Sequence, residues 1–269
     1  MSRPLLILLA TLTMATFTSL SYAKVITQRI EYKDGDTVLE GVLAFDDSAK
    51  DKRPGVLVCP EWWGCNAYAQ KRAEMLAELG YVAFAIDMFG KGKTTEDPKQ
   101  AGAWAGEVFK DPAALRTRAA KGLAILTASD KVDTTRLAAI GYCMGGTVAL
   151  ELARSGLSGT GNLKAVVAFH ASTIAAKNAD ENTNIKGTVL ICHGALDNFV
   201  QPDQIPTFEK QMAEAKIDYV FIAYAGAKHA FTNPNADNHP GLGVAYNKLA
   251  DQRSWEHMKQ LFTERLSAK

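Results

Sequence analysis

Short apolar runs alternate with longer amphipathic stretches along most of this chain. Residues 25–32 and 37–45 alternate apolar and polar residues around Asp34-Gly35, which predicts an antiparallel hairpin at the start of a sheet. The continuous apolar run at 55–59 is typical of a strand buried on both faces. Further strands are predicted at residues 81–86, 137–141, 165–169, 188–192 and 219–224.

The stretches between these runs predict helices. We expect them over residues 67–79, from Asp111-Pro112 to about Ser129, directly after Cys143, over 206–216 and over 244–266. Residues 91–111 are polar and weakly periodic, which predicts a loop with a short helix, a candidate wall or lid over a pocket. Alternating strands and helices indicate an α/β fold with a mostly parallel, doubly wound sheet. The carboxyl ends of parallel strands share one edge, where functional sites form.

The first 23 residues have the pattern of a secretory signal peptide. Arg3 is followed by the apolar run 5–10, and Ser21-Tyr22-Ala23 is a small-x-small cleavage site. Threonines and serines interrupt the apolar run well short of a membrane span. We therefore expect an exported protein, periplasmic or secreted, with one α/β domain over residues 24–269 and no membrane association after cleavage.

The charge balance argues against polyanionic partners. The full chain has 30 Lys and Arg against 29 Asp and Glu, and removing residues 1–23 takes away Arg3 and no acid, which leaves 29 of each. A near-neutral chain is an unlikely match for nucleic acid or an anionic membrane surface. We expect a monomer that acts on a small molecule.

Four cysteines follow the predicted cleavage site, namely Cys59, Cys65, Cys143 and Cys192. Their spacings do not resemble a zinc site or a redox Cys-x-x-Cys motif. Cys59 and Cys192 lie in apolar strand-like runs, which favours small buried side chains. The sequence assigns no role to Cys65.

Cys143 lies in a turn with the spacing Gly-x-nucleophile-x-Gly, at residues 141–145. A nucleophile on a tight strand-to-helix turn stands clear of both elements, but its neighbours must be small. Gly141 and Gly145 remove side chains that would clash, and Gly146 allows the helix to pack close to the sheet. The helix N-terminus also favours a thiolate and a developing oxyanion. A buried structural cysteine is the alternative interpretation of this turn.

The residues expected to assist a nucleophile follow in a matching order. A catalytic thiol needs a base, and the base needs an orienting carboxylate. On a strand–nucleophile–helix scaffold the chain order is nucleophile, acid, histidine. Asp197 follows a predicted strand in a glycine loop, and His229 follows the last predicted strand. We therefore predict a triad of Cys143, Asp197 and His229 at one edge of the sheet.

Other histidines and acids fit this pattern less well. His170 and His193 precede Asp197, which breaks the order. His239 falls in a loop and His257 in the terminal helix. Asp87 also ends a strand, but it precedes the nucleophile.

Four motifs resemble those of dienelactone hydrolase (carboxymethylenebutenolidase), a family of the α/β-hydrolase superfamily. They are Glu61 after the third strand, Gly-Tyr-Cys-x-Gly-Gly at the turn, Gly-x-x-Asp at 194–197 and Gly-x-x-His-x-Phe at 226–231, in this order. The resemblance spans nearly the whole predicted mature chain. It implies the α/β-hydrolase fold and hydrolysis of an ester or lactone without a metal or organic cofactor.

The resemblance also implies roles for residues beside the triad. Glu61 would hydrogen-bond the resting thiol and swing away when substrate arrives, leaving a thiolate–imidazolium pair. The oxyanion would be bound by the backbone N–H groups of Met144 and Trp62. In the family, basic residues hold a substrate carboxylate. Their positions here correspond to Lys91, which cannot form the forked pair of an arginine, and to Asn233, which is uncharged.

Aromatic residues flank the predicted catalytic groups. Trp62, Trp63, Tyr142 and Phe231 could wall an apolar substrate pocket, although aromatics near strand ends are more often core. Two alternatives stay open for the function. One is a broader carboxylesterase, thioesterase or acyl transferase on the same triad. The other is a non-catalytic or thiol-redox protein in which Cys143 pairs with Cys59 or Cys65.

Overall fold

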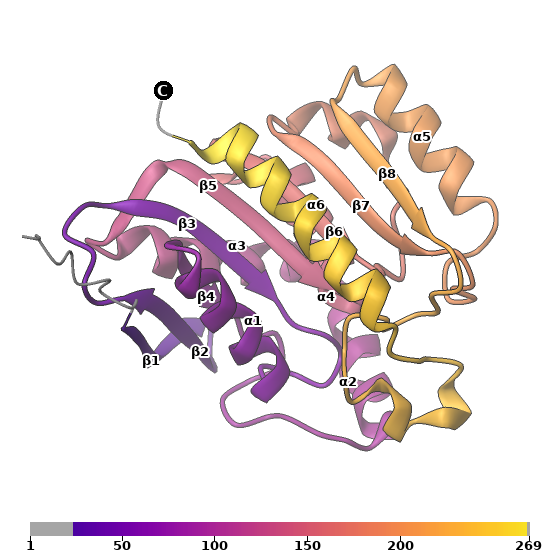
Figure 1. The fold of residues 1–269 in the computed structure, drawn as a ribbon, viewed down its shortest axis with the longest axis horizontal. Coiled ribbons are helices and arrows are strands. Elements are labelled where there is room, and N and C mark those ends of the chain that lie inside the picture. The colour runs from indigo at the N-terminus through magenta and orange to yellow at the C-terminus, as the bar shows by residue number, and fades with distance from the viewer. Residues whose placement is uncertain (1–23, 268–269) are drawn as a thin grey trace, which may run out of the picture.

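An eight-stranded sheet in the order β1-β2-β4-β3-β5-β6-β7-β8 forms the centre of the molecule (Figure 1). The structure is a computed structural model that describes residues 24–267, so the predicted signal peptide lies outside the described residues. The strands are β1 Val25–Asp34, β2 Thr37–Asp46, β3 Arg53–Cys59, β4 Val82–Ala85, β5 Val132–Tyr142, β6 Leu163–Phe169, β7 Thr188–Gly194 and β8 Tyr219–Tyr224.

The strand pairing agrees with the predicted α/β class. β1 and β2 form an antiparallel hairpin in which Asp34 lies opposite Thr37, and Gly35 adopts a φ of 58° in its turn. β2 is antiparallel to β4, whereas β4, β3 and β5 to β8 are mutually parallel. The predicted mostly parallel sheet with an N-terminal antiparallel hairpin is therefore confirmed.

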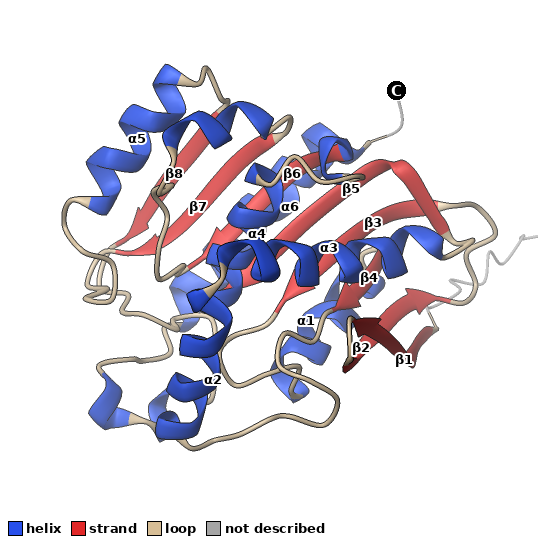
Figure 2. Cartoon of the chain, turned by 180° about the vertical axis from the view of Figure 1, so that it is seen from behind, coloured by secondary structure: helices blue, strands red, loops and turns tan. Residues whose placement is uncertain are grey.

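Helices cover both faces of the sheet, as Figure 1 and Figure 2 show from opposite sides. They are α1 Ala67–Glu78, α2 Pro98–Lys110, α3 Pro112–Ala128, α4 Met144–Arg154, α5 Gln204–Glu214 and α6 Lys248–Leu266. Val56 and Val58 of β3 pack into the core cluster of α1 and α6, while Leu57 packs into the cluster of α3 and α4. Successive residues of a central strand thus point to opposite faces of the sheet. Because helices cover both faces, residues on either side are apolar, and the strand appears in the sequence as an unbroken apolar run.

The structure corrects the prediction for residues 91–111. Residues 98–110 form a full helix, α2, where the sequence predicts a loop with a short helix. The helix buries only Ala101 and Ala105, and such small side chains give little apolar periodicity. Its start is nevertheless marked by Asp97, whose side chain caps the N–H of Lys99.

The terminal helix begins at Lys248 rather than at Val244. The side chain of Asn247 caps it by accepting a hydrogen bond from the N–H of Ala250. Val244 instead pairs with His229 in an isolated parallel bridge. The stretch before the helix is thus tied to the loop that carries the predicted base.

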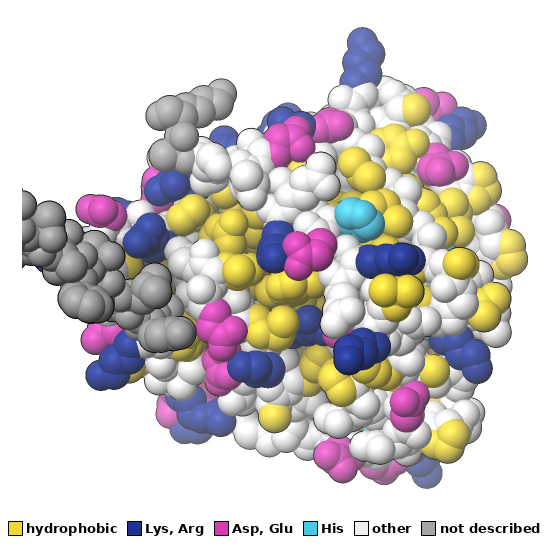
Figure 3. Space-filling model, in the orientation of Figure 1, with side chains coloured by type: hydrophobic (Ala, Val, Ile, Leu, Met, Phe, Trp, Pro, Cys, Tyr) yellow, Lys and Arg dark blue, Asp and Glu magenta, His cyan; other side chains and the backbone are white. Residues whose placement is uncertain are grey.

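Lysine, arginine and acidic side chains are interspersed on the face shown in Figure 3. This mixture agrees with the formal net charge of +1. Among residues 24–267, no helix combines the length and apolarity that a membrane span requires.

Candidate active site

The turn between β5 and α4 presents Cys143 with a φ of 54° and a ψ of −121°, which a side-chain-bearing residue rarely adopts. A Cβ on Gly141 would collide with the carbonyl oxygen of Gly145, and a Cβ on Gly145 with the carbonyl oxygen of Cys59. A Cβ on Gly146 would press against Ala171. The glycines therefore permit the close approach that forces Cys143 out of both elements.

His229 and Asp197 are hydrogen-bonded to each other. Nδ1 of His229 lies 2.8 Å from Oδ2 of Asp197, and both side chains are buried. The other carboxylate oxygen of Asp197 accepts the N–H of Phe199 at 2.8 Å. The Phe199 ring stacks on the imidazole at a centroid distance of 4.3 Å. Asp197 thus fixes the tautomer and the orientation of His229.

Cys143 and His229 line the same cavity, which has a volume of about 140 Å³. Burial by itself would lower the pKa of His229, but the Cys143 sulfur and the Asp197 carboxylate outweigh burial and raise this pKa. Nε2 of His229 is buried and has no hydrogen-bond partner among the described residues. This nitrogen is therefore available to the thiol or to a bound substrate.

The cavity is mostly apolar. Besides Cys143, His229 and Ser172, its lining consists of Glu61, Trp62, Trp63, Ala105, Phe109, Met144, Phe199, Ala230, Asn233, Ala236, His239, Leu242 and Val244. Trp63 stacks on His239 at a centroid distance of 4.7 Å. Helix α2 supplies Ala105 and Phe109, so the segment predicted as a wall does contribute one. No lysine or arginine belongs to this lining.

The backbone N–H groups of Met144 and Trp62 have no hydrogen-bond partner within residues 24–267. Both residues line the cavity, and Met144 is the first residue of α4. Unpaired N–H groups at such a position favour an oxyanion. The two predicted oxyanion donors thus line the same cavity as Cys143.

Glu61 is buried beside these groups, with 2% of its surface exposed. Its Oε2 accepts a hydrogen bond of 2.6 Å from the amide of Asn233, and its Oε1 has no partner among the described residues. Burial raises the pKa of Glu61 to about 7, against the opposing effects of Asn233 and His229. Asn233 thus binds Glu61 rather than standing free to clamp a substrate.

The structure does not bring the other predicted substrate-binding residues to the cavity. Lys91 is about half exposed and pairs with Glu31 and, at 3.9 Å, with Glu40 at the β1–β2 hairpin. Tyr142 and Phe231 are fully buried core residues and do not line the cavity. The side chain of Tyr142 points into the core because β5 alternates the faces of its residues up to the turn.

His170, which the sequence sets aside as a rival base, contacts the backbone of Cys143, the predicted nucleophile. The N–H of Cys143 is shared between Nδ1 of His170 and the carbonyl oxygen of Phe169, each at 3.0 Å. With Nδ1 as an acceptor, the proton of a neutral ring lies on Nε2 and is donated to Oγ1 of Thr232 at 2.6 Å. Burial lowers the pKa of His170 well below its ordinary value, and the nearby His229 lowers it further. His170 therefore stays neutral and links the turn of Cys143 to the loop of His229.

A buried arginine holds that loop from the other side. Arg72 of α1 donates to the carbonyl oxygen of Thr232 and to Asp251 of α6, both at 2.6 Å. The Tyr68 hydroxyl completes the network at 2.7 Å from Oγ1 of Thr232. The only sequence signal for this network is a positive charge on the apolar face of a predicted helix, where a charge must be paired.

Asp87 serves a turn and not the triad. Its Oδ1 accepts the N–H groups of Phe89 and Gly90, and its Oδ2 accepts that of Glu40.

All four cysteines are free thiols, and Cys143 is the one that is not buried. No cluster of His, Cys, Asp or Glu side chains suited to a metal ion occurs among residues 24–267.

The fold and the glycine-bracketed turn at Cys143 are those of the α/β-hydrolase class. The profile of the dienelactone hydrolase family matches residues 39–266, and the chain belongs to this family. The solved structure of a protein named m3DLH is 42% identical with a TM-score of 0.85, over 90% of this chain and 99% of that one.

Two further relatives agree with this assignment. "Dienelactone Hydrolase-like Promiscuous Phospotriesterase P91 from Metagenomic Libraries" is 36% identical with a TM-score of 0.86, again over 90% and 99% of the two chains. The "Putative carboxymethylenebutenolidase" of Yersinia pestis is 26% identical over 84% of each chain. The chain is therefore a hydrolase that acts on ester or lactone bonds.

The first prediction concerns His170. We expect His170→Leu to lower kcat for a small ester by about 10- to 100-fold with little change in KM, because a buried hydrogen-bonded link between nucleophile and base is lost. His170→Asn should recover part of the loss, since asparagine tolerates the φ of 38° found here and offers an oxygen to the N–H of Cys143. Steady-state kinetics of both variants, with circular dichroism to verify folding, test this role. Wild-type kcat in His170→Leu would contradict it.

The second prediction concerns the buried carboxyl of Glu61. Its pKa is about 7 in the folded chain against 4.5 for the free group, so the folded state binds more protons between these pH values. Its contribution to stability is therefore complete below about pH 4.5 and is lost as the pH rises through 7. The loss amounts to at most about 3 kcal/mol.

Urea unfolding at pH 5 and pH 8 measures this effect. The decrease in the free energy of unfolding from pH 5 to pH 8 should be smaller in Glu61→Gln than in the wild type. The control is Glu96→Gln, an exposed acid whose replacement should keep the wild-type difference. If the free energy of unfolding of Glu61→Gln decreased from pH 5 to pH 8 by as much as that of the wild type, the Glu61 carboxyl would have the same pKa in the folded and unfolded chains.

Proposed function

We propose that this protein hydrolyses small esters or lactones through a covalent acyl-enzyme formed on Cys143. The observation that carries the proposal is the meeting of Cys143 on its strained turn with the His229–Asp197 pair in one cavity. A free thiol is only slightly ionised at neutral pH. The raised pKa of His229 favours transfer of the thiol proton to this imidazole.

The reaction then proceeds in two halves. The Cys143 thiolate attacks the carbonyl carbon, and the N–H groups of Met144 and Trp62 bind the oxyanion. Nε2–H of His229 protonates the leaving alcohol, which leaves a thioester on Cys143. His229 next removes a proton from water, which attacks the thioester and releases the acid and the thiolate. Asp197 stabilises the imidazolium in both halves.

In this proposal, Glu61 and Asn233 control the protonation of the Cys143 thiol before substrate binds. A carboxyl with a pKa near 7 can share a proton with the thiol before substrate binds. The unpaired Oε1 of Glu61 supports this role, while Asn233 holds the other oxygen at 2.6 Å.

We further propose that the preferred substrates carry no charge next to the reacting carbonyl. The lining of the cavity contains no lysine or arginine, Lys91 lies at the β1–β2 hairpin, and Asn233 is occupied by Glu61. A carboxylate beside the carbonyl would lose water without gaining an ionic partner. A neutral phosphotriester meets the same condition and is a second electrophile worth testing, given the name of the relative P91.

A substrate panel tests the mechanism. The wild type should hydrolyse p-nitrophenyl acetate and an uncharged lactone faster than a lactone with a ring carboxylate. Cys143→Ala should lose at least about 10⁴-fold in kcat, because the nucleophile is gone. Mass spectrometry of the quenched wild type should find the acetyl group on the Cys143 peptide.

The matched control is Cys192→Ala, which removes a buried thiol that lies outside the cavity. It should retain activity. Full activity in Cys143→Ala would refute the cysteine mechanism, and a slow, disulfide-locked Cys143 in thiol titration would favour the redox alternative. Thioester and alcohol-acceptor arms of the same panel separate a thioesterase or acyl transferase from a hydrolase of esters.

We also propose export, on the basis of the signal-like pattern in residues 1–23. Expression of the full chain in a bacterium should yield a periplasmic protein whose first residue is Lys24. Amino-terminal sequencing of the periplasmic and cytoplasmic fractions measures this. An uncleaved chain confined to the cytoplasm would contradict export.

A further inference from the structure

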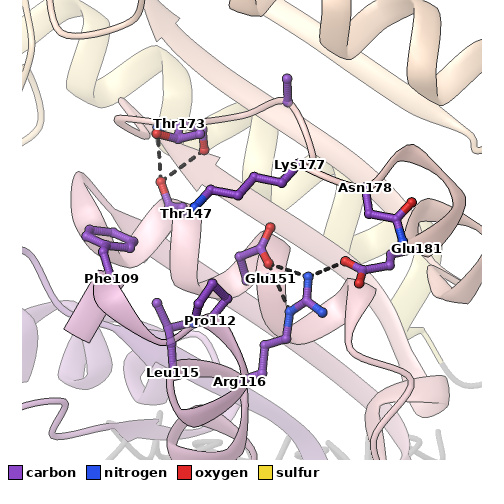
Figure 4. Close-up of a pocket in the computed structure, with 11 residues that line it drawn as sticks. Phe109, Pro112, Leu115, Arg116, Thr147, Glu151, Thr173, Lys177, Asn178 and Glu181 are labelled. Atoms are coloured by element: carbon purple, nitrogen blue, oxygen red, sulfur yellow. Dashed lines mark hydrogen bonds and ion pairs between the residues drawn. The ribbon is translucent and has the colours of Figure 1, made fainter. Parts of the chain in front are cut away.

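A second, larger cavity of about 370 Å³ (Figure 4) shares Phe109 with the cavity that holds Cys143. The first turns of α3 and α4 and the segment after β6 enclose it. Its lining consists of Phe109, Pro112, Leu115, Arg116, Thr147, Glu151, Thr173, Ala175, Lys177, Asn178 and Glu181. None of these residues enters the mechanism above.

The two cavities adjoin. Phe109 lines both of them, and Ser172 of the first is followed directly by Thr173 of the second. Thr147 lies one helical turn after Cys143 on α4, a rise of about 6 Å. The second cavity therefore begins within about one helical turn of Cys143 along α4.

The ionic groups at the far end of the cavity balance one another. Arg116 pairs with Glu151 at 2.6 Å and also with Glu181 (Figure 4), and Arg154 pairs with Glu151 at 3.0 Å. Two arginines thus neutralise two glutamates. Phe109, Pro112, Leu115 and Ala175 supply an apolar wall.

Lys177 adds one charge that this cluster does not balance. Its ammonium forms no ion pair with any of the residues 24–267. Figure 4 shows its side chain extended across the cavity toward Thr147. The Thr147 hydroxyl accepts the N–H of Thr173 and donates to its carbonyl oxygen, and the Lys177 ammonium forms no hydrogen bond with it. Lys177 is therefore free to bind an anion from a ligand.

The geometry also indicates which part of a substrate reaches this cavity. The leaving alcohol must lie next to His229, which protonates it. Several residues of the loop 229–244, which carries His229, line the first cavity, and none of them lines the second. The acyl part, which stays on Cys143, is thus the part directed along α4.

We propose that the second cavity binds the acyl arm of the substrate and that Lys177 pairs with a carboxylate at the far end of this arm. The substrates are then monoesters or lactones whose acyl chain ends in an anionic group about one helical turn from the carbonyl. Methylene groups contact Phe109, Pro112 and Leu115. This inference rests on the proposed function and specifies its substrate class.

A pair of matched esters tests it. Mono-p-nitrophenyl adipate and p-nitrophenyl hexanoate have acyl chains of the same length and differ in the terminal carboxylate. In Lys177→Gln, kcat/KM should fall by about fivefold for the adipate ester, the effect of one partly solvated ion pair, and stay unchanged for the hexanoate ester. Lys177→Glu should lower the adipate value further through repulsion. Added salt should reduce the preference for adipate in the wild type only.

The control is Lys121→Gln, which removes the same charge from an exposed position on α3 outside both cavities. It should leave the adipate-to-hexanoate ratio at the wild-type value. A ratio that Lys177→Gln does not change, with both esters hydrolysed, would overturn this inference and leave the proposed function standing. A wild type that hydrolyses no ester would instead refute the proposed function.

Discussion

The packing of backbone against backbone at the turn after β5 is the constraint on which the site depends. Gly141, Gly145 and Gly146 allow α4 to approach β3 and β5 so closely that any Cβ would collide with a neighbouring chain segment. Cys143 accepts an unfavourable φ of 54° as a consequence. Its half-buried side chain is thereby presented at the edge where the parallel strands end, within reach of loops from other strands.

Two histidines near this turn have opposite roles because their partners differ. His229 bonds to a carboxylate and faces a thiol, so its charged form is stabilised. His170 receives a hydrogen bond from the backbone of Cys143 and forms none with a carboxylate, so burial keeps it neutral. An imidazole whose charged form is stabilised and one that stays neutral therefore lie with ring centroids only 5.2 Å apart.

The distribution of cations shapes substrate recognition. The residue that the family resemblance assigns to a substrate carboxylate, Lys91, is held by glutamates at the hairpin. The cavity at Cys143 is left apolar, and an unpaired cation, Lys177, lies beyond it along α4. Any selectivity for anionic substrates would accordingly act on the far end of the acyl chain rather than beside the reacting bond.

The sequence by itself determined the sheet, the hairpin and the order in which Cys143, Asp197 and His229 follow their strands, because these depend on local periodicity and on turn chemistry. It did not reveal α2, since Ala101 and Ala105 bury too little surface to mark a face. The tertiary structure alone decided which polar groups meet across the chain: Asn233 with Glu61, His170 with Cys143, and Arg72 with Thr232 and Asp251. Such contacts join residues far apart in sequence, and no local pattern encodes the partner that a buried polar group will find.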